Sequence, residues 1–244
     1  MRNLKLTIEY DGTNYSGWQS QTNAPTIQDT LESAFARILS HRVGLIGAGR
    51  TDSGVHALGQ VANFKTASSL ELSSLLRGAN SLLPNDIMIR KIEEVDAIFH
   101  ARFSAKSRIY EYHIWDNPLP SVFHRNYTWW IRDGLDASLM GKAVLHLLGH
   151  HDFSSFQGAD KEEVFSEREV MTAAFERRGP KLVFSIEANA FLRHMVRNII
   201  GTLIEVGKGK ISPKNFFEIF AARDRRKAGI TAPGCGLFLK HVRY

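Results

Sequence analysis

Cysteine is nearly absent from this chain of 244 residues, since Cys235 is the only one. This absence excludes an intrachain disulfide and any zinc site built on several cysteines. Long apolar runs are also missing, because no stretch approaches the ~20 residues that a membrane helix needs. The first residues enter an alternating segment at once, so we expect no signal peptide. The reducing cytoplasm is therefore the expected location.

The net charge of +6 is unevenly distributed along the chain. Residues 176–244 contain 14 Lys and Arg against 5 Asp and Glu, a net charge of +9, whereas residues 1–175 contain 17 against 20, a net charge of −3. A basic C-terminal third suggests a polyanionic partner, because neutralised phosphates release counterions. A solvated basic surface accounts for the same charge, so charge alone does not decide between the two.

Hydrophobic periodicity in the first half predicts the order β-α-β-β-α-β, which is the ferredoxin-like pattern. Thr26 is the expected N-cap of the first helix, and Asp29 is placed like the acid of a capping box. The second helix must end before Pro84. The expected elements cover residues 4–10, 27–39, 43–46, 57–65, 69–83 and 87–92.

The second half repeats this scheme with additions. Asp136 is the expected cap of one helix, and Ser212 followed by Pro213 begins another in the usual order of cap and first-turn proline. Residues 177–180 predict a hairpin turn. The expected elements cover residues 108–115, 137–148, 170–176, 181–187, 191–207, 213 onward and 236–242. We therefore predict an α+β chain with two domains, residues 1–104 and 105–244.

Residues 47–54, Gly-Ala-Gly-Arg-Thr-Asp-Ser-Gly, are the densest cluster of functional residue types. Three glycines allow a tight loop between two strands. Arg50 could hold a phosphate while Asp52, two residues later, faces a reacting centre. From spacing alone, such a segment is more often a structural turn with an Asx hydrogen bond. It is not a phosphate-cradling P-loop, because no Gly-Lys-Ser/Thr follows at the required spacing.

Aromatic residues occur in two further segments that suit RNA. Residues 15–21 combine Tyr15 and Trp18 with amides, and such side chains stack on unpaired bases and read base edges. An ordinary loop with one anchoring tryptophan is the alternative. Tyr110 and Tyr112 share one face of the expected strand at residues 108–115. Tyr110 could stack on a base, although half-buried strand tyrosines are commoner.

Two groups of side chains remain ambiguous in the sequence. Arg193 and Arg197 lie one helical turn apart. If exposed they are merely solvated, but within reach of Asp52 the guanidinium of Arg197 would be a carboxylate partner. His146 and His150 are spaced i, i+4, and His151-Asp152 follows. Without a His-Glu-x-x-His motif, surface histidines at a helix end are favoured, and no metal site is expected.

Taken together, these segments resemble the TruA family of tRNA pseudouridine synthases. The similarity covers nearly the whole chain and follows the order of the family's motifs. Its signature is similar to residues 49–57, with Ser53 where alanine is usual. The other matching segments are residues 15–21, 108–110, 189–201 and 236–239.

The resemblance implies conversion of uridine to pseudouridine at positions 38, 39 and 40, in the anticodon stem-loop of tRNA. It implies no metal or organic cofactor, and a homodimer that holds each tRNA across both subunits. It also implies two ferredoxin-like halves whose antiparallel sheets join into one, with helices on one face and a central cleft. A cytoplasmic enzyme that flips its target base out of the stack is expected.

The resemblance also assigns roles to individual residues: Asp52 is the essential carboxylate, Arg197 its partner and Tyr110 the base-stacking tyrosine. Arg50 helps to extrude the base, and Leu237 is placed in substrate binding. The geometric expectation is that Asp52 lies in a cleft between the halves, within reach of Arg197.

The chemistry suits these residue types. A sugar carbon that loses its base develops positive charge, which a carboxylate can stabilise or trap. The same carboxylate could instead assist proton abstraction from C2′, and Tyr110 could either stack or remove the C5 proton. A catalytically silent RNA-binding protein would leave Asp52, Tyr110 and Arg197 without a reason to occur together. A nucleotide-hydrolysing enzyme would lack its phosphate lysine and its metal carboxylates.

Overall fold

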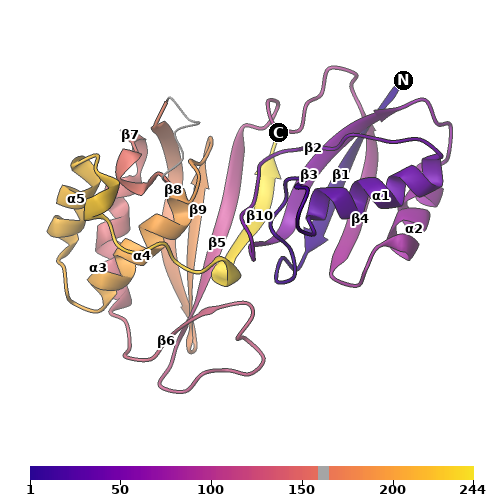
Figure 1. Cartoon of the computed structure of the whole chain (residues 1–244). Helices are drawn as coiled ribbons and strands as arrows, with labels where there is room; N and C mark the ends of the chain where they lie inside the picture. Colours follow the sequence, from indigo (N-terminus) through magenta and orange to yellow (C-terminus); the bar gives the residue numbers. More distant parts are fainter. Residues whose placement is uncertain (159–164) are drawn as a thin grey trace. The chain divides into compact units, whose positions relative to one another are not determined.

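The computed structural model describes residues 1–158 and 165–244. Its contacts divide the chain into two compact units: Met1–Lys106 with Phe238–Tyr244 form unit 1, and Ser107–Leu237 form unit 2 (Figure 1). Both units combine helices with a mostly antiparallel sheet, which agrees with the mixed α and β content expected from periodicity. Along the described residues, every helix is too short or too polar to cross a lipid bilayer.

The sheet of unit 1 has β1 at its centre, antiparallel to β3 on one side and to β4 on the other. β2 pairs with β3 in antiparallel fashion, and β10 pairs in parallel with His56 and Ala57 of β3. α1 lies in front of this sheet in Figure 1 and packs against α2, which contacts β4. These elements are β1 (Arg2–Tyr10), α1 (Ile27–Leu39), β2 (Ile46–Gly47), β3 (His56–Thr66), α2 (Leu72–Leu82), β4 (Ile87–Val95) and β10 (Leu237–Arg243).

Local sequence explains the elements of unit 1. Leu4, Leu6 and Ile8 are fully buried on one face of β1, as their alternation predicts. The Thr26 hydroxyl accepts the N–H of Asp29 (3.2 Å) and donates to its carboxylate (2.6 Å), so the predicted cap is confirmed. Burial alone would raise the pKa of Asp29, but hydrogen bonds from Thr26 and Ser20 lower it below its usual value.

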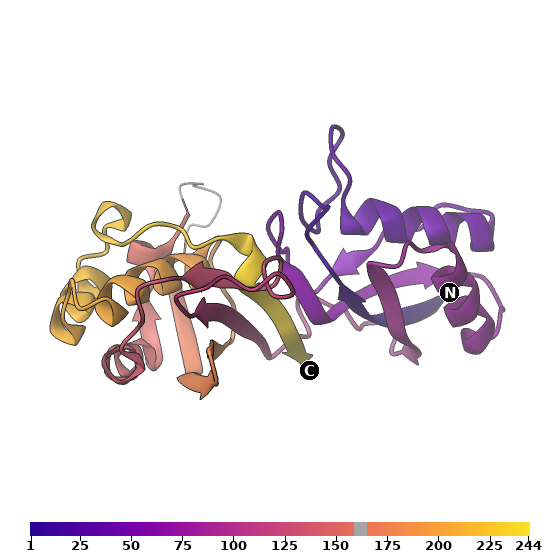
Figure 2. The same ribbon diagram turned by 90° about the horizontal axis from the view of Figure 1, so that it is seen from below.

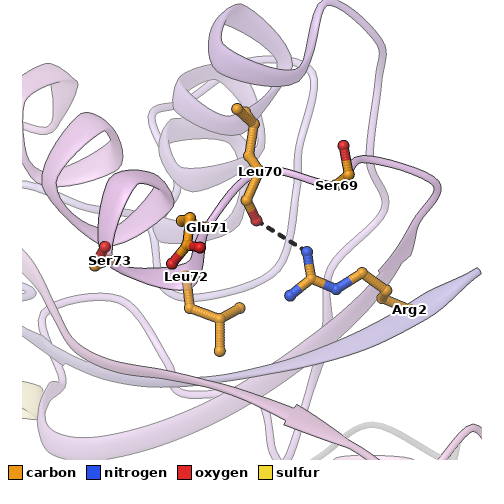
Figure 3. A pocket seen from close by; sticks show the side chains of 6 residues that line it. All are labelled: Arg2, Ser69, Leu70, Glu71, Leu72 and Ser73. Atoms are coloured by element: carbon orange, nitrogen blue, oxygen red, sulfur yellow. Dashed lines mark hydrogen bonds between the residues drawn. The ribbon is translucent and has the colours of Figure 1, made fainter.

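A hollow of about 590 Å³ lies before the first turn of α2, lined by Arg2 and residues 69–73 (Figure 3). Arg2 donates to the carbonyl oxygens of Leu70 (2.9 Å) and Ser68 (3.2 Å), and its Nε pairs with the Glu94 carboxylate (2.9 Å). Arg2 therefore ties β1 to β4 and to the segment before α2. None of the lining residues belongs to the loop that carries Asp52.

The sheet of unit 2 has the order β5-β9-β8-β7, with antiparallel neighbours, and β6 adds to β5 in parallel. α3 packs against α4, α5 and β8 (Figure 2). The elements are β5 (Ser107–Asp116), β6 (Trp129–Ile131), α3 (Ala137–Val144), β7 (Gly149–Asp152), β8 (Glu167–Arg178), β9 (Lys181–Ala188), α4 (Met195–Gly207) and α5 (Pro213–Ala221). Asp136 and Ser212 cap α3 and α5 as predicted.

The strand predicted at residues 43–46 is wrong in all but its last residue, because β2 covers only Ile46–Gly47. Side chains of α1 replace the missing strand partner. The Glu32 carboxylate accepts the N–H of Leu45 (2.8 Å), and the Gln28 amide donates to its carbonyl oxygen (3.3 Å). The backbone N–H and carbonyl oxygen of Leu45 are thus satisfied without a sheet ladder.

Two helices of unit 2 have other limits than predicted. α4 begins at Met195 rather than near residue 191, because His194 adopts a left-handed conformation with φ 60° that a helix cannot include. α3 ends at Val144 and tightens into a three-ten turn, Leu145–Leu147, instead of continuing to residue 148. The short strands β6 and β7 have no counterpart among the predictions.

Candidate active site

The loop that carries Asp52 joins β2 to β3 in unit 1 and contains a tight turn. The carbonyl oxygen of Asp52 accepts the N–H of Val55 (3.2 Å), and Gly54 takes a positive φ of 72° inside this turn. Glycine suits that position because it has no Cβ. Asp52 is half-buried, and Arg50, two residues earlier, is exposed.

The backbone on both sides of Asp52 is held by the loop after β1. Trp18 N–H donates to the Thr51 carbonyl oxygen (3.0 Å), and Gly54 N–H donates to the Tyr15 carbonyl oxygen (3.3 Å). Gly17, at φ 95°, lies so close that a Cβ there would meet the Thr51 oxygen at 2.5 Å. The two loops therefore interlock through main-chain contacts, and Asp52 projects from a fixed support.

Buried side chains brace the same loop from the sheet. The hydroxyls of Tyr10 and Thr51 are 2.7 Å apart, and the fully buried Gln60 amide donates to the Gly49 carbonyl oxygen (2.9 Å). Burial raises the pKa of Tyr10 to about 12, although its bonds to Thr51 and Gln60 oppose this shift. The Tyr10 hydroxyl is thus neutral at any physiological pH and can hold Thr51 throughout.

His56, which begins β3, holds the other end of this loop. Its Nδ1 accepts the N–H of Gly12 (3.0 Å) and lies 3.1 Å from the Asp11 carboxylate. Its ring stacks on Phe238 with 4.7 Å between centroids. Gly12 approaches so closely that a Cβ there would meet the Val55 carbonyl oxygen at 2.0 Å. The motif of residues 49–57 is therefore anchored at both ends.

Replacing Tyr10 with phenylalanine is expected to lower the free energy of unfolding by roughly 1–3 kcal/mol, because Thr51 and Gln60 each lose a buried partner. Thr51 adjoins Asp52, the carboxylate expected from sequence to be catalytic, and on that expectation kcat should also fall by up to about tenfold. Denaturant unfolding and single-turnover kinetics measure the two effects. Tyr244→Phe, which removes a bond to the Ala101 carbonyl oxygen (2.8 Å) elsewhere in unit 1, is the control. An unchanged kcat in Tyr10→Phe would limit this bond to a structural role.

The loop at residues 15–21 is the ordinary anchored loop rather than a base-stacking surface. Trp18 is only 2% exposed and packs against Gly47, and the Tyr15 hydroxyl donates to the Asp86 carboxylate (2.7 Å). Burial is the main cause that raises the pKa of Tyr15 above its usual value. Trp18 therefore supports the start of the Asp52 loop from inside the protein, and the Tyr15 side chain ties its own loop to Asp86.

Tyr110 lies in β5 of unit 2, on the same face as Tyr112. It is mostly buried and meets the Phe191 ring edge-on, with 5.0 Å between centroids. Tyr112 is fully buried and donates to the Pro233 carbonyl oxygen (2.8 Å), and burial raises its pKa. Leu237, the first residue of β10, is also buried and belongs to the same unit.

Arg197 projects from the first turn of α4, also in unit 2. Its Nε donates to the Ala232 carbonyl oxygen (2.7 Å), while the Ala232 N–H donates to the Arg197 carbonyl oxygen (3.1 Å). This reciprocal pair fixes the base of the guanidinium. Burial raises the pKa of the nearby Cys235 thiol, and the positive charge of Arg197 acts against that rise.

A second hollow, of about 530 Å³, lies at the start of α4 and is strongly basic. Asp224 pairs with Arg226 at its edge (2.9 Å), and that bond lowers the pKa of Asp224 to about 2. The residues lining the hollow are Gly158, Arg193, His194, Arg225, Arg226 and residues 228–231. Phosphate groups are the natural ligands of such a surface.

His146 and His151 have structural partners. The His146 ring lies 4.9 Å from the Phe217 ring, and His151 Nε2 lies 2.7 Å from the Leu148 carbonyl oxygen. The Asp152 carboxylate accepts the Ser154 N–H (2.9 Å). In the part of the chain that the structure describes, no three His, Cys, Asp or Glu side chains gather closely enough to hold a metal ion.

Comparison with known proteins adds the decisive observation. Residues 6–104 and 143–244 match the family model described as tRNA pseudouridine synthase. The chain belongs to the tRNA pseudouridine synthase family. It is 46% identical over all 244 residues to tRNA pseudouridine synthase A of Acetivibrio thermocellus, and 45% identical to that of Thermoanaerobacter sp. strain X514, with full coverage of both chains. The protein of the same name from Moorella thermoacetica is 43% identical over 99% of each chain.

An enzyme of the tRNA pseudouridine synthase family is an isomerase that converts uridine in tRNA to pseudouridine. The structure adds polar residues around the proposed site that sequence reasoning did not single out. Tyr10 and Gln60 support the Asp52 loop, and Asn198 and Arg225 lie around α4. The sequence gives one signal, the polar Asn198 within the apolar segment of α4, and this does not reveal which residue Asn198 binds.

Proposed function

We propose that this chain isomerises the uridines at positions 38, 39 and 40 in the anticodon stem-loop of tRNA, with Asp52 as the catalytic carboxylate on a flipped-out uridine. One observation carries the choice of Asp52. The residue before it, Thr51, is held twice: its carbonyl oxygen accepts the backbone N–H of Trp18, and its hydroxyl bonds to the Tyr10 hydroxyl. A carboxylate held this firmly suits a reaction that depends on exact placement beside a sugar carbon.

The reaction breaks the bond from C1′ to N1, turns the uracil and joins C1′ to C5. The hydrogen on C5 leaves to solvent and N1 gains one, so no oxidant, reductant or cofactor is consumed. Asp52 either stabilises or traps the developing positive charge at C1′, or assists removal of the C2′ proton toward a glycal. Both routes require the carboxylate in its ionised form.

The other proposed site residues serve base flipping and charge balance. Tyr110 stacks on the extruded base, a contact worth roughly 1–3 kcal/mol, and Leu237 lines the binding site. Arg50, exposed on the Asp52 loop, assists extrusion of the base. Arg197 is the proposed partner of the Asp52 carboxylate and balances its charge. The hollow with Arg193 and Arg226 takes part in holding backbone phosphates.

We further propose that both halves are ferredoxin-like and that two copies of the chain form a cytoplasmic homodimer that holds each tRNA across both subunits. The strand order β4-β1-β3-β2 in unit 1 supports the first part, because it is the order of that fold. The order β5-β9-β8 in unit 2 is compatible with it. Domain limits at residues 1–104 and 105–244 remain our proposal.

Unmodified tRNA with tritium at C5 of its uridines tests the function directly. We expect tritium release without any added cofactor, because C5 loses its hydrogen when it bonds to C1′. Transcripts in which positions 38–40 carry no uridine are the control and should release none. Intact tRNA binding without tritium release would identify a catalytically silent RNA-binding protein instead.

Arg197→Lys is expected to lower kcat by roughly 100-fold, because lysine keeps the charge but loses the planar fork of the guanidinium. Circular dichroism and thermal unfolding check that the variant folds, and single-turnover tritium release measures the effect. Arg177→Lys is the control, because Arg177 bonds to Asp116 (2.6 Å) in unit 2 and has no proposed role in catalysis or binding. Near wild-type turnover in Arg197→Lys would remove Arg197 from its proposed role.

Tyr110→Phe is expected to retain at least about a third of the wild-type kcat, because the ring that stacks on the base remains. Tyr110→Ala should raise the Kd for tRNA or lower kcat far more, since it removes the stack. Tritium release and filter binding distinguish the effects. A collapse of kcat in Tyr110→Phe with unchanged tRNA binding would instead assign proton removal to the hydroxyl.

A further inference from the structure

Residues 228–233 form a segment that crosses α4 of unit 2 in close contact. In Figure 1 the chain leaving α5 runs across α4 toward the start of β10. The Gly229 N–H donates to the Thr202 hydroxyl (2.9 Å). A Cβ on Gly201 would meet the Ile230 carbonyl oxygen at 1.7 Å, so the two backbones touch there. The position of this segment is therefore tied to α4.

Arg225 is the side chain that organises the segment. Its Nη1 donates to the carbonyl oxygens of Ala228 (3.3 Å) and Gly229 (2.8 Å). Its Nη2 donates to Asn198 Oδ1 (3.0 Å) and to the Thr231 hydroxyl (3.1 Å). One planar guanidinium thus joins three residues of the segment to α4. Lysine, with a single ammonium group, cannot reproduce this fork.

Asn198 completes the network from the helix. It is fully buried, and its amide nitrogen donates to the Phe156 carbonyl oxygen (2.8 Å). Its Oδ1 accepts the Thr231 hydroxyl (2.7 Å) as well as Arg225. Each of these polar groups has a partner, so the network is rigid and specific.

The network ends at Arg197. Arg197 precedes Asn198 on α4, and Ala232 follows Thr231 in the segment. The carbonyl oxygen of Ala232 accepts Nε of Arg197 at 2.7 Å. Any shift of Thr231 relative to Asn198 moves this carbonyl oxygen, and the guanidinium turns with it.

We infer that Arg225, together with Asn198 and Thr231, is a positioning residue that sets the orientation of the Arg197 guanidinium for the isomerisation. This inference rests on the proposed role of Arg197. Arg225 also lines the basic hollow, but both its terminal nitrogens donate to groups of the protein. In this role it therefore acts through Arg197 and does not hold a phosphate. Its loss therefore lowers the rate of the chemical step and leaves tRNA affinity nearly unchanged.

Arg225→Gln is expected to lower kcat 10- to 100-fold, with KM for tRNA within about threefold of wild type. Arg177→Gln is the matched control, because Arg177 also makes structural bonds in unit 2, to Asp116 (2.6 Å) and to the Leu135 carbonyl oxygen (3.3 Å). Its kcat should stay within twofold of wild type. A rise in KM with unchanged kcat in Arg225→Gln would overturn the inference.

A second pair of variants tests the network if Arg225→Gln folds poorly. Thr231→Val removes the hydroxyl that joins Arg225 to Asn198 and should lower kcat about tenfold. Thr231→Ser keeps the hydroxyl and should restore kcat to within twofold of wild type. Equal kcat values for the two variants would overturn the inference.

Coupling to Arg197 separates positioning from general support of the fold. In an Arg197→Ala background, Arg225→Gln should lower single-turnover tritium release by less than twofold, because the group it orients is gone. Suppose that Arg197→Ala is nearly inactive and that Arg225→Gln lowers its rate by the same factor as it lowers the wild-type rate. The positioning inference then fails, and the role of Arg197 stands. If Arg197→Ala retains wild-type kcat, the proposed role of Arg197 fails, and the inference with it.

Discussion

Asp52→Asn is expected to abolish tritium release from C5-labelled tRNA, with a loss of roughly 10⁴-fold or more. The amide has the size of the carboxylate but no negative charge, so it cannot stabilise a developing cation at C1′ or take a proton. The variant should fold, because hydrogen bonds of the neighbouring residues hold the loop. The loop is held by the main chain of Thr51 and Gly54 and by the Tyr10 hydroxyl. We therefore expect an unchanged unfolding midpoint and a Kd for tRNA within a few-fold of wild type.

Ser53→Ala is the matched control for the loop. Ser53 is exposed and follows Asp52 directly, and its hydroxyl makes one long contact to the Tyr15 carbonyl oxygen (3.3 Å). We expect its kcat to stay within twofold of wild type. If Asp52→Asn released tritium at more than about a hundredth of the wild-type rate, the carboxylate would not be essential and the proposed mechanism would fall.

The sequence predicted those elements that depend on interactions between residues close together in the chain. The alternation in residues 4–10 gives β1 because one face is buried against the core. Thr26, Asp136 and Ser212 each accept an N–H from the residue three positions on, as N-caps do. The failures have causes that hydrophobic periodicity does not reveal. Leu45 takes its backbone hydrogen bonds from α1 side chains, and α4 starts late because of the left-handed His194.

The candidate site was less accessible from sequence. The motif at residues 49–57 drew attention to Asp52, but alone it did not separate a catalytic loop from a turn. The hydrogen bond between Tyr10 and Thr51 joins residues 41 positions apart, and hydrophobic periodicity does not predict such a pair. Sequence also could not tell that Trp18 is buried, so its ring was open to an RNA-stacking interpretation. Burial depends on tertiary packing, which composition does not encode.

Gly201→Ala is expected to be the most destabilising single-methyl change in α4, with a loss of roughly 3 kcal/mol in the free energy of unfolding. A Cβ at this position would lie 1.7 Å from the Ile230 carbonyl oxygen, whereas real Cβ contacts stay above 3.0 Å. The segment of residues 228–233 must then retreat by more than 1 Å. Since Ala232 holds Arg197, kcat should fall together with stability.

Gly141→Ala separates this steric effect from the intrinsic preference of helices for alanine. Gly141 lies within α3, and a Cβ there would meet no atom within 4 Å. Alanine should therefore raise the free energy of unfolding by up to about 1 kcal/mol and leave kcat unchanged. Denaturant unfolding of both variants with single-turnover kinetics makes the comparison. Equal stability of the two would contradict the contact between α4 and the crossing segment. A stability loss in Gly201→Ala without a loss of kcat would detach that segment from the orientation of Arg197.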